Sequence, residues 1–168
     1  MRMRVALSLL FLSLCVSCGA SSAQIKTAKT AVYTAAPNQI LDIAVQVAQR
    51  TYKVRDIDPS KNMFITDGQW YTAEGGRIGT TDEGNGDYVN AGGGDVRVAF
   101  EVRLVPVDAD ATNRFSVVIE QHTFQLVSGS PQPRELKTDD PNLPPWVKGR
   151  VDTLALDIYE AAKPLVHP

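Results

Sequence analysis

Cysteine is nearly absent from this 168-residue chain, and both copies, Cys15 and Cys18, lie in its first 18 residues. The remainder can form no disulfide and no thiolate zinc site. Histidine is just as scarce, with His122 and His167 only, so paired imidazole ligands at short spacing are excluded. Lys and Arg (17) do not outnumber Asp and Glu (19), so no basic surface for nucleic acid is indicated. We expect no cofactor and no nucleic-acid partner.

Catalytic motifs are missing as well. The chain has no G-x-S-x-G nucleophile elbow, no H-E-x-x-H helix and no phosphate-binding P-loop pattern. His122 stands in a strand pattern with no second ligand or nucleophile near it in sequence, and it is interpreted as a structural residue on a sheet face. The sequence therefore predicts a protein that is not an enzyme, with no catalytic and no metal-ligating residue.

No apolar run is long enough to cross a bilayer, which takes about 20 helical residues. The longest run, residues 5–16, follows Arg2 and Arg4 and precedes a series of small residues, as in a secretory signal peptide. Val16-Ser17-Cys18-Gly19 resembles a bacterial lipobox, in which the cysteine is acylated and becomes the first mature residue. We predict a lipoprotein signal over residues 1–18 and lipidation of Cys18.

The site of cleavage sets the expected localisation. Acyl chains on Cys18 would anchor the protein stably to a membrane. Gly19 follows the cysteine, and by resemblance to enterobacterial lipoproteins this implies the outer membrane, with the domain facing the periplasm. The alternative is ordinary cleavage after Ala23, where small residues also occur, which would give a soluble periplasmic or secreted protein.

The patterns that are present describe one domain. Residues 19–25 are small and polar and predict a tether, and residues 26–165 form a single α+β domain. The order β-α-β-β-β-β-α predicts an antiparallel sheet of about five strands with two helices packed on one face. The elements are expected at a first strand over 26–35, a helix over 37–50, a hairpin over 52–66, long strands over 96–107 and 114–127, and a helix over 146–163.

The clearest strand alternates apolar and mostly polar positions over residues 96–104, which indicates one buried and one wetter face. The following strand begins with Phe115, Val117 and Ile119 in one phase and continues with Phe124 in the other. Such a change predicts either a bulge near residues 120–123 or a strand that changes its packing partner.

Eight of the twelve glycines fall within residues 73–94, which predicts a long mobile loop. Its acidic part does not have the spacing of a calcium loop. Trp70 and Tyr71 stand where the loop begins. Two interpretations remain open: the aromatics cap the core, or together with the loop they form a partner-binding site.

The order of elements resembles the BamC family, periplasmic lipoproteins of the outer-membrane barrel-assembly machinery. The resemblance is carried by the proline-led helix at Pro37, by Tyr52-Lys53-Val54-Arg55-Asp56 and by Phe64-Ile65-Thr66-Asp67-Gly68-Gln69-Trp70. It covers about residues 30–165 and implies a non-catalytic domain. The chain has one such domain where that family carries two.

The resulting hypothesis is a non-enzymatic envelope lipoprotein that binds another envelope protein or assists outer-membrane assembly. A carrier of a small ligand is the alternative, and an envelope enzyme is a third. A carrier would enclose an apolar cavity of about 300 Å³ or more. A binding domain would instead expose an apolar or aromatic patch or an open sheet edge.

Overall fold

A seven-stranded antiparallel sheet forms the centre of the computed structural model, which describes residues 20–78, 92–108 and 113–166. Five strands follow the order β1-β6-β5-β3-β2, while β4 pairs with β5 beyond β3 and β7 pairs with β6 beyond β1. The strands are β1 (Tyr33–Thr34), β2 (Val54–Asp58), β3 (Met63–Thr66), β4 (Gln69–Tyr71), β5 (Val96–Pro106), β6 (Arg114–Gln125) and β7 (Arg134–Leu136).

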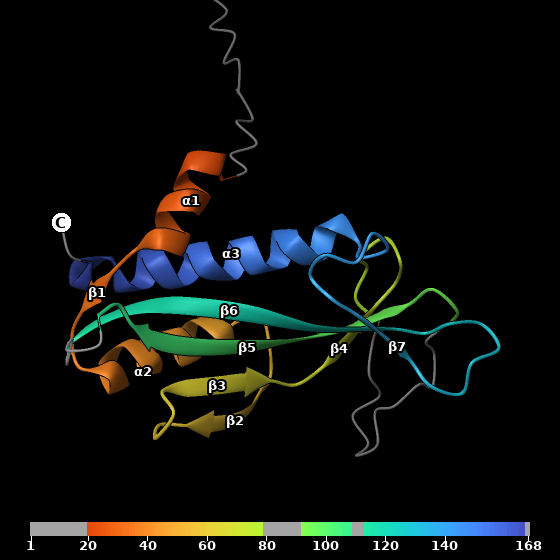
Figure 1. Cartoon of the computed structure of the whole chain (residues 1–168), viewed down its shortest axis with the longest axis horizontal. Coiled ribbons are helices and arrows are strands. Elements are labelled where there is room, and N and C mark those ends of the chain that lie inside the picture. The colour runs from red at the N-terminus through yellow and green to blue at the C-terminus, as the bar shows by residue number, and fades with distance from the viewer. Residues whose placement is uncertain (1–19, 79–91, 109–112, 167–168) are drawn as a thin grey trace, which may run out of the picture.

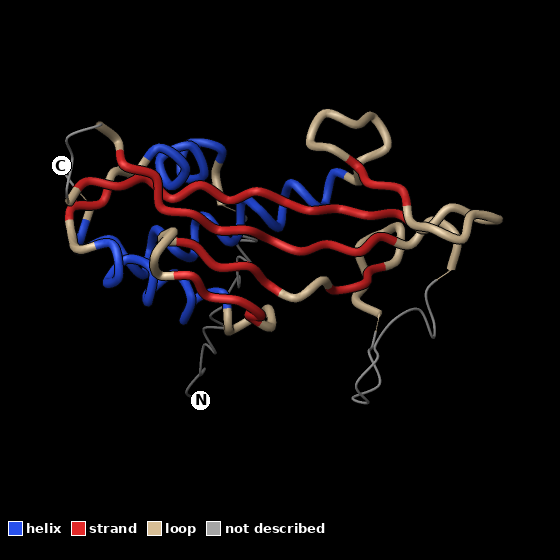
Figure 2. Tube along the Cα trace, turned by 60° about the horizontal axis from the view of Figure 1, so that its bottom comes forward, coloured by secondary structure: helices blue, strands red, loops and turns tan. Residues whose placement is uncertain are grey.

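Within the described residues, the helices lie on one face of this sheet and leave the other face without a helix (Figures 1 and 2). They are α1 (Ser22–Thr30), α2 (Pro37–Ala48) and α3 (Pro145–Ala162), the last followed by a 3-10 turn at Lys163–Leu165. Proline occupies the first position of α2 and α3, where its fixed φ suits a helix and its missing N–H costs nothing. The α+β class predicted from the sequence is confirmed, with helices packed against an antiparallel sheet.

The core lies between the sheet and the helices. Every second residue of β5 from Val96 to Leu104 is buried there, as the alternation predicts. α2 contributes the apolar stripe that includes Ile40, Leu41 and Ala44, and α3 contributes Leu154 and Ile158. Two helices on one face of the sheet are therefore as expected from the 3.6-residue periodicity.

α1 is the element that the sequence interpretation missed, since residues 19–25 were expected to be a tether and 26–35 a strand. Ser21 accepts a hydrogen bond from the Gln24 amide, and the Gln24 side chain accepts one from the Ser21 amide, which completes a capping box. The helix then packs on α3 through the buried Ala28 and an ion pair between Lys29 and Asp152. Only Tyr33 and Thr34 remain as a strand.

The expected bulge near residues 120–123 does not occur. β5 and β6 stay in one register from Val96 opposite Gln125 to Pro106 opposite Phe115. Phe124 is out of phase with Phe115 because it lies on the opposite face of the sheet, beside Arg97. On the edge that does not face β5, however, β6 changes its partner: it pairs with β1 at Phe115 and with β7 at Phe124.

The hydroxyl group of Tyr33 is buried, and buried hydroxyls usually have a hydrogen-bond partner. The residue is 1% exposed, and its Oη has no hydrogen-bond partner in the structure as described. Burial raises the pKa of Tyr33 to about 12, with a smaller contribution from Tyr159, so the phenol stays neutral in the folded protein at ordinary pH. An unpaired buried hydroxyl costs about 1–3 kcal/mol.

Tyr33→Phe should therefore raise the free energy of unfolding by about 1 kcal/mol, measured by urea denaturation at pH 7. Because the pKa is raised in the folded state, titration of Tyr33 does not change the free energy of unfolding below pH ~10 and lowers it as the pH rises from ~10 through ~12. The wild type should thus lose stability between these values more steeply than the variant. A destabilised Tyr33→Phe protein would show that the hydroxyl has a partner.

Candidate functional site

The site lies on the open face of the sheet, at an irregularity between β3 and β4. Ile65 pairs with Glu101, and Gln69 pairs with Val98, so three residues of the β3–β4 segment face two residues of β5. This is the residue count of a β-bulge. The Asp67 amide turns outward and donates to the Lys53 carbonyl at 2.7 Å. The next residue, Gly68, has no side chain, so the open face has a gap there.

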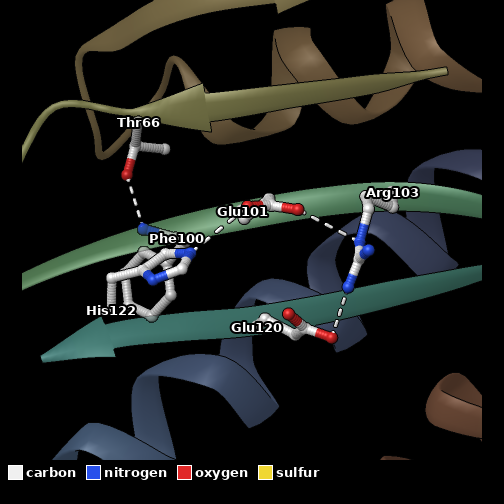
Figure 3. A network of polar contacts seen from close by, with 6 residues as sticks. All are labelled: Thr66, Phe100, Glu101, Arg103, Glu120 and His122. Carbon is white, nitrogen blue, oxygen red and sulfur yellow. Dashed lines mark hydrogen bonds and ion pairs between the residues drawn. The ribbon is translucent and has the colours of Figure 1, made fainter. Parts of the chain in front are cut away.

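Thr66 completes the sheet at the bulge. Its side chain is fully buried, and its Oγ1 accepts a hydrogen bond of 2.8 Å from the Phe100 amide (Figure 3). Phe100 lies between the β5 residues that pair with β3 and those that pair with β4. The threonine hydroxyl therefore replaces the carbonyl that a regular ladder would supply.

We predict that Thr66→Val lowers the free energy of unfolding by about 1–2 kcal/mol, because valine keeps the shape and removes the acceptor of a buried N–H. Thr66→Ser, which keeps the hydroxyl, is the matched control and should retain protection of the Phe100 amide in hydrogen exchange. Equal protection in Thr66→Val would mean that this amide has another acceptor.

The gap forms a cavity of about 290 Å³. A hollow can form here because Gly68 has no side chain and that of Ala99 is a single methyl group. Charged and apolar groups surround them and come from four strands and the β3–β4 connection. The lining residues are Arg55, Ile65, Thr66, Gly68, Arg97, Ala99, Glu101, His122 and Phe124.

Two charged groups of the wall are already paired. The Glu101 side chain, only 16% exposed, has Oε1 at 3.1 Å from Arg103 Nε and Oε2 at 3.3 Å from His122 Nε2 (Figure 3). Arg103 also contacts Glu120, its diagonal neighbour on β6. On β2, Arg55 Nε lies 2.6 Å from Asp56 Oδ2. Glu101 thus has ion-pair and hydrogen-bond partners within the sheet, although it shares Arg103 with Glu120.

Arg97 differs from these neighbours. Its guanidinium lies over Gly68, so close that a Cβ on residue 68 would stand 2.2 Å from Arg97 Nε. The side chain is half-buried, and among the residues that the structure describes it has no ion-pair or hydrogen-bond partner. A guanidinium carries five N–H donors, so this one can accept an anion from outside the chain.

The two aromatics named as partner-binding residues, Trp70 and Tyr71, are both buried, at 4% and 2% exposure. They point to opposite faces: Tyr71 belongs to the core cluster, while Trp70 pairs with Arg97 on the open face. The burial of Tyr71 agrees with the interpretation that it caps the core, whereas Trp70 is buried on the opposite face of the sheet. Partner binding through these two side chains stays a prediction, as does loop mobility over residues 71–94, of which 79–91 lie outside the described residues.

Tyr71 is held by the first turns of α3. Its ring centroid lies 5.2 Å from that of Trp146, and the Arg150 guanidinium stands 4.1 Å above the Tyr71 ring. Burial raises the pKa of Tyr71 above its ordinary value, and the charge of Arg150 acts in the opposite direction. The cluster is therefore a packing and cation–π contact at neutral pH.

The remaining sequence-based residues are placed as follows. His122 lies on the open face of β6, as expected, and lines the cavity. Cys18 and the signal over residues 1–18 lie outside the described residues. No group of three His, Cys, Asp or Glu side chains within the described ranges could hold a metal. In the same ranges, no helix has the length and hydrophobicity required to span a membrane.

Comparison with protein-family models and with curated proteins finds no match for this chain.

Proposed function

We propose that the chain is a non-enzymatic envelope lipoprotein whose domain binds another envelope protein through the open face of its sheet. One observation carries the proposal: the cavity at Gly68 and Ala99, on the face that no helix covers (Figure 2). The cavity opens to the outside of the sheet, and its walls combine apolar groups with Arg97, a cation that has no ion-pair partner among the described residues. Such a combination is typical of a recognition surface.

A small-ligand carrier is the second candidate, favoured by the volume of about 290 Å³, which is near the lower limit for ligand pockets. The open position of the site argues for the first candidate. The cavity lies on an uncovered sheet face, whereas a carrier pocket encloses most of its ligand. Protein binding through the open face therefore fits better.

Site-specific photocrosslinking of the full-length protein in its native envelope tests this function. A benzophenone residue at Ile65, on the cavity wall, should give a discrete crosslinked partner. The same probe at Gln46, exposed on α2 across the sheet, is the matched control and should give none. Identical products from both positions, or none from Ile65, would contradict binding at the open face.

The lipid anchor is a separate part of the proposal. Acylation at Cys18 should retain the protein in the membrane fraction, and Cys18→Ser should release it in soluble form or leave it unprocessed. Mass spectrometry of the mature wild type should find a diacylated or triacylated N-terminal cysteine. A mature chain that begins at Gln24 would instead establish ordinary cleavage after Ala23.

A further inference from the structure

We propose that the cavity at Gly68 binds a carboxylate that stands beside an apolar group, with Arg97 as the anion-binding residue. This deepens the proposed function and rests on it, because it names the part of a partner that the open face would recognise. The apolar group would rest on Ile65, Ala99 and Phe124, which line the same cavity.

The charge of the cavity supports an anionic ligand. Two cations, Arg55 and Arg97, and one anion, Glu101, line it. Glu101 shares Arg103 with Glu120, and Arg55 is paired with Asp56. Among the residues that the structure describes, Arg97 is the charged side chain of the cavity wall that has no ion-pair or hydrogen-bond partner. An anionic group of a ligand can therefore pair with Arg97 without displacing an existing partner.

The placement of Arg97 supports a carboxylate in particular. The Gly68 backbone shields part of the guanidinium from water. The guanidinium is therefore less well hydrated, and it gains no hydrogen-bond acceptor in return. A carboxylate can accept two parallel N–H bonds from one guanidinium, and such charge-assisted bonds are about twice as strong as neutral ones.

The size of the cavity limits the ligand to about one amino-acid residue. Carboxylates of this size occur as free small acids and as acidic or terminal residues of a protein, and both share the chemistry proposed here. The protein source follows from the open position of the site on a sheet face. The experiment must therefore include both forms.

The test uses the domain in its full chain, ¹⁵N-labelled, titrated with N-acetyl-leucine and followed by amide chemical shifts. We expect saturable shifts at the cavity-lining amides with a Kd on the order of 1 mM, as for so small a ligand. N-acetyl-leucinamide, which lacks the charge, should bind at least about tenfold more weakly. A blocked peptide with an internal Glu-Leu pair should bind more tightly than the free acid if the source is a protein.

Two variants connect the binding to Arg97. Arg97→Gln should weaken the binding of N-acetyl-leucine at least about tenfold. Gly68→Ala, whose Cβ would displace the guanidinium, should weaken binding of N-acetyl-leucine, while the amide spectrum should remain that of a folded protein. Arg114→Gln is the matched control: it removes the same charge from the same sheet, where Arg114 pairs with Asp108 outside the cavity, and should bind as the wild type.

The outcomes separate this inference from the proposed function. Absence of saturable shifts up to about 20 mM, well above the expected Kd, would overturn the carboxylate site. Equal affinity of Arg97→Gln and wild type would overturn it too. A specific crosslink at Ile65 could still be found in either case, and binding of a protein at the open face would then stand with another chemistry. Tighter binding of the free acid than of the peptide would favour the carrier function.

Discussion

Replacing Phe100 with alanine should lower the free energy of unfolding by about 3–5 kcal/mol, the largest effect expected for a single side chain of this domain. Phe100 is completely buried in the centre of β5. Its ring makes an edge contact with Tyr52 at 4.9 Å between centroids and lies in the cluster shared by the sheet, α2 and α3. Alanine would leave a cavity between the two layers, which costs more than the lost apolar area alone.

Urea denaturation at fixed pH measures the effect, and Val105→Ala on the same strand is its matched control. Val105 is 41% exposed on the other face of β5. Its replacement should cost less than about 1 kcal/mol, including the lower strand propensity of alanine. Equal losses from the two substitutions would mean that the face carrying Phe100 is not the one that holds the layers together.

The same alternation explains why the fold class was predictable from the sequence. β5 has eleven residues with a strict period of two, and α2 has its apolar residues on one stripe. Long periodic segments fix which face is buried, and the antiparallel order follows from short connections. α1 was missed because Thr27 and Thr30 were interpreted as strand formers. Their hydroxyls instead donate to the carbonyls four residues earlier in the helix.

The cavity was not predictable to the same degree, because it depends on a register offset of one residue between β3 and β4. No periodicity reveals such an offset in strands of four and three residues. A signal was nevertheless present. Asp67-Gly68 interrupts the apolar pattern where a bulge would lie, and Ala99 is the one small residue in the outward series Arg97, Glu101, Arg103. The two together mark a hollow on the open face.

Trp146→Ala is expected to have the second largest effect, a loss of about 2–4 kcal/mol in the free energy of unfolding. This is somewhat less than the loss expected when a fully buried tryptophan is replaced. The Trp146 ring packs on Tyr71, and its Nε1 donates to the Ala73 carbonyl at 2.8 Å. Gly75, at φ +90°, approaches the ring so closely that a Cβ there would lie 2.9 Å from it. The indole therefore holds the turn that follows β4.

This turn lies next to β4, the strand that carries Trp70. Its end is fixed to β4, since the Ile78 amide donates to the Trp70 carbonyl and the Gln69 side chain donates to the Ile78 carbonyl. Trp70 in turn stands beside Arg97 in the register. Loss of the indole should thus loosen the turn, speed hydrogen exchange at the Gly75 and Ile78 amides, and also weaken binding of N-acetyl-leucine.

Trp146→Phe separates packing from hydrogen bonding. It retains the aromatic contact and loses only the Nε1 donor, so about 1 kcal/mol should be lost and the exchange at Gly75 should rise slightly. Lys148→Ala, at an exposed position of the same helix, should change neither quantity. If Trp146→Ala lowers stability but leaves exchange at Gly75 and Ile78 as in the wild type, α3 does not hold the turn. The turn would then owe its order to its own hydrogen bonds, such as that from the Thr72 amide to the Gly76 carbonyl.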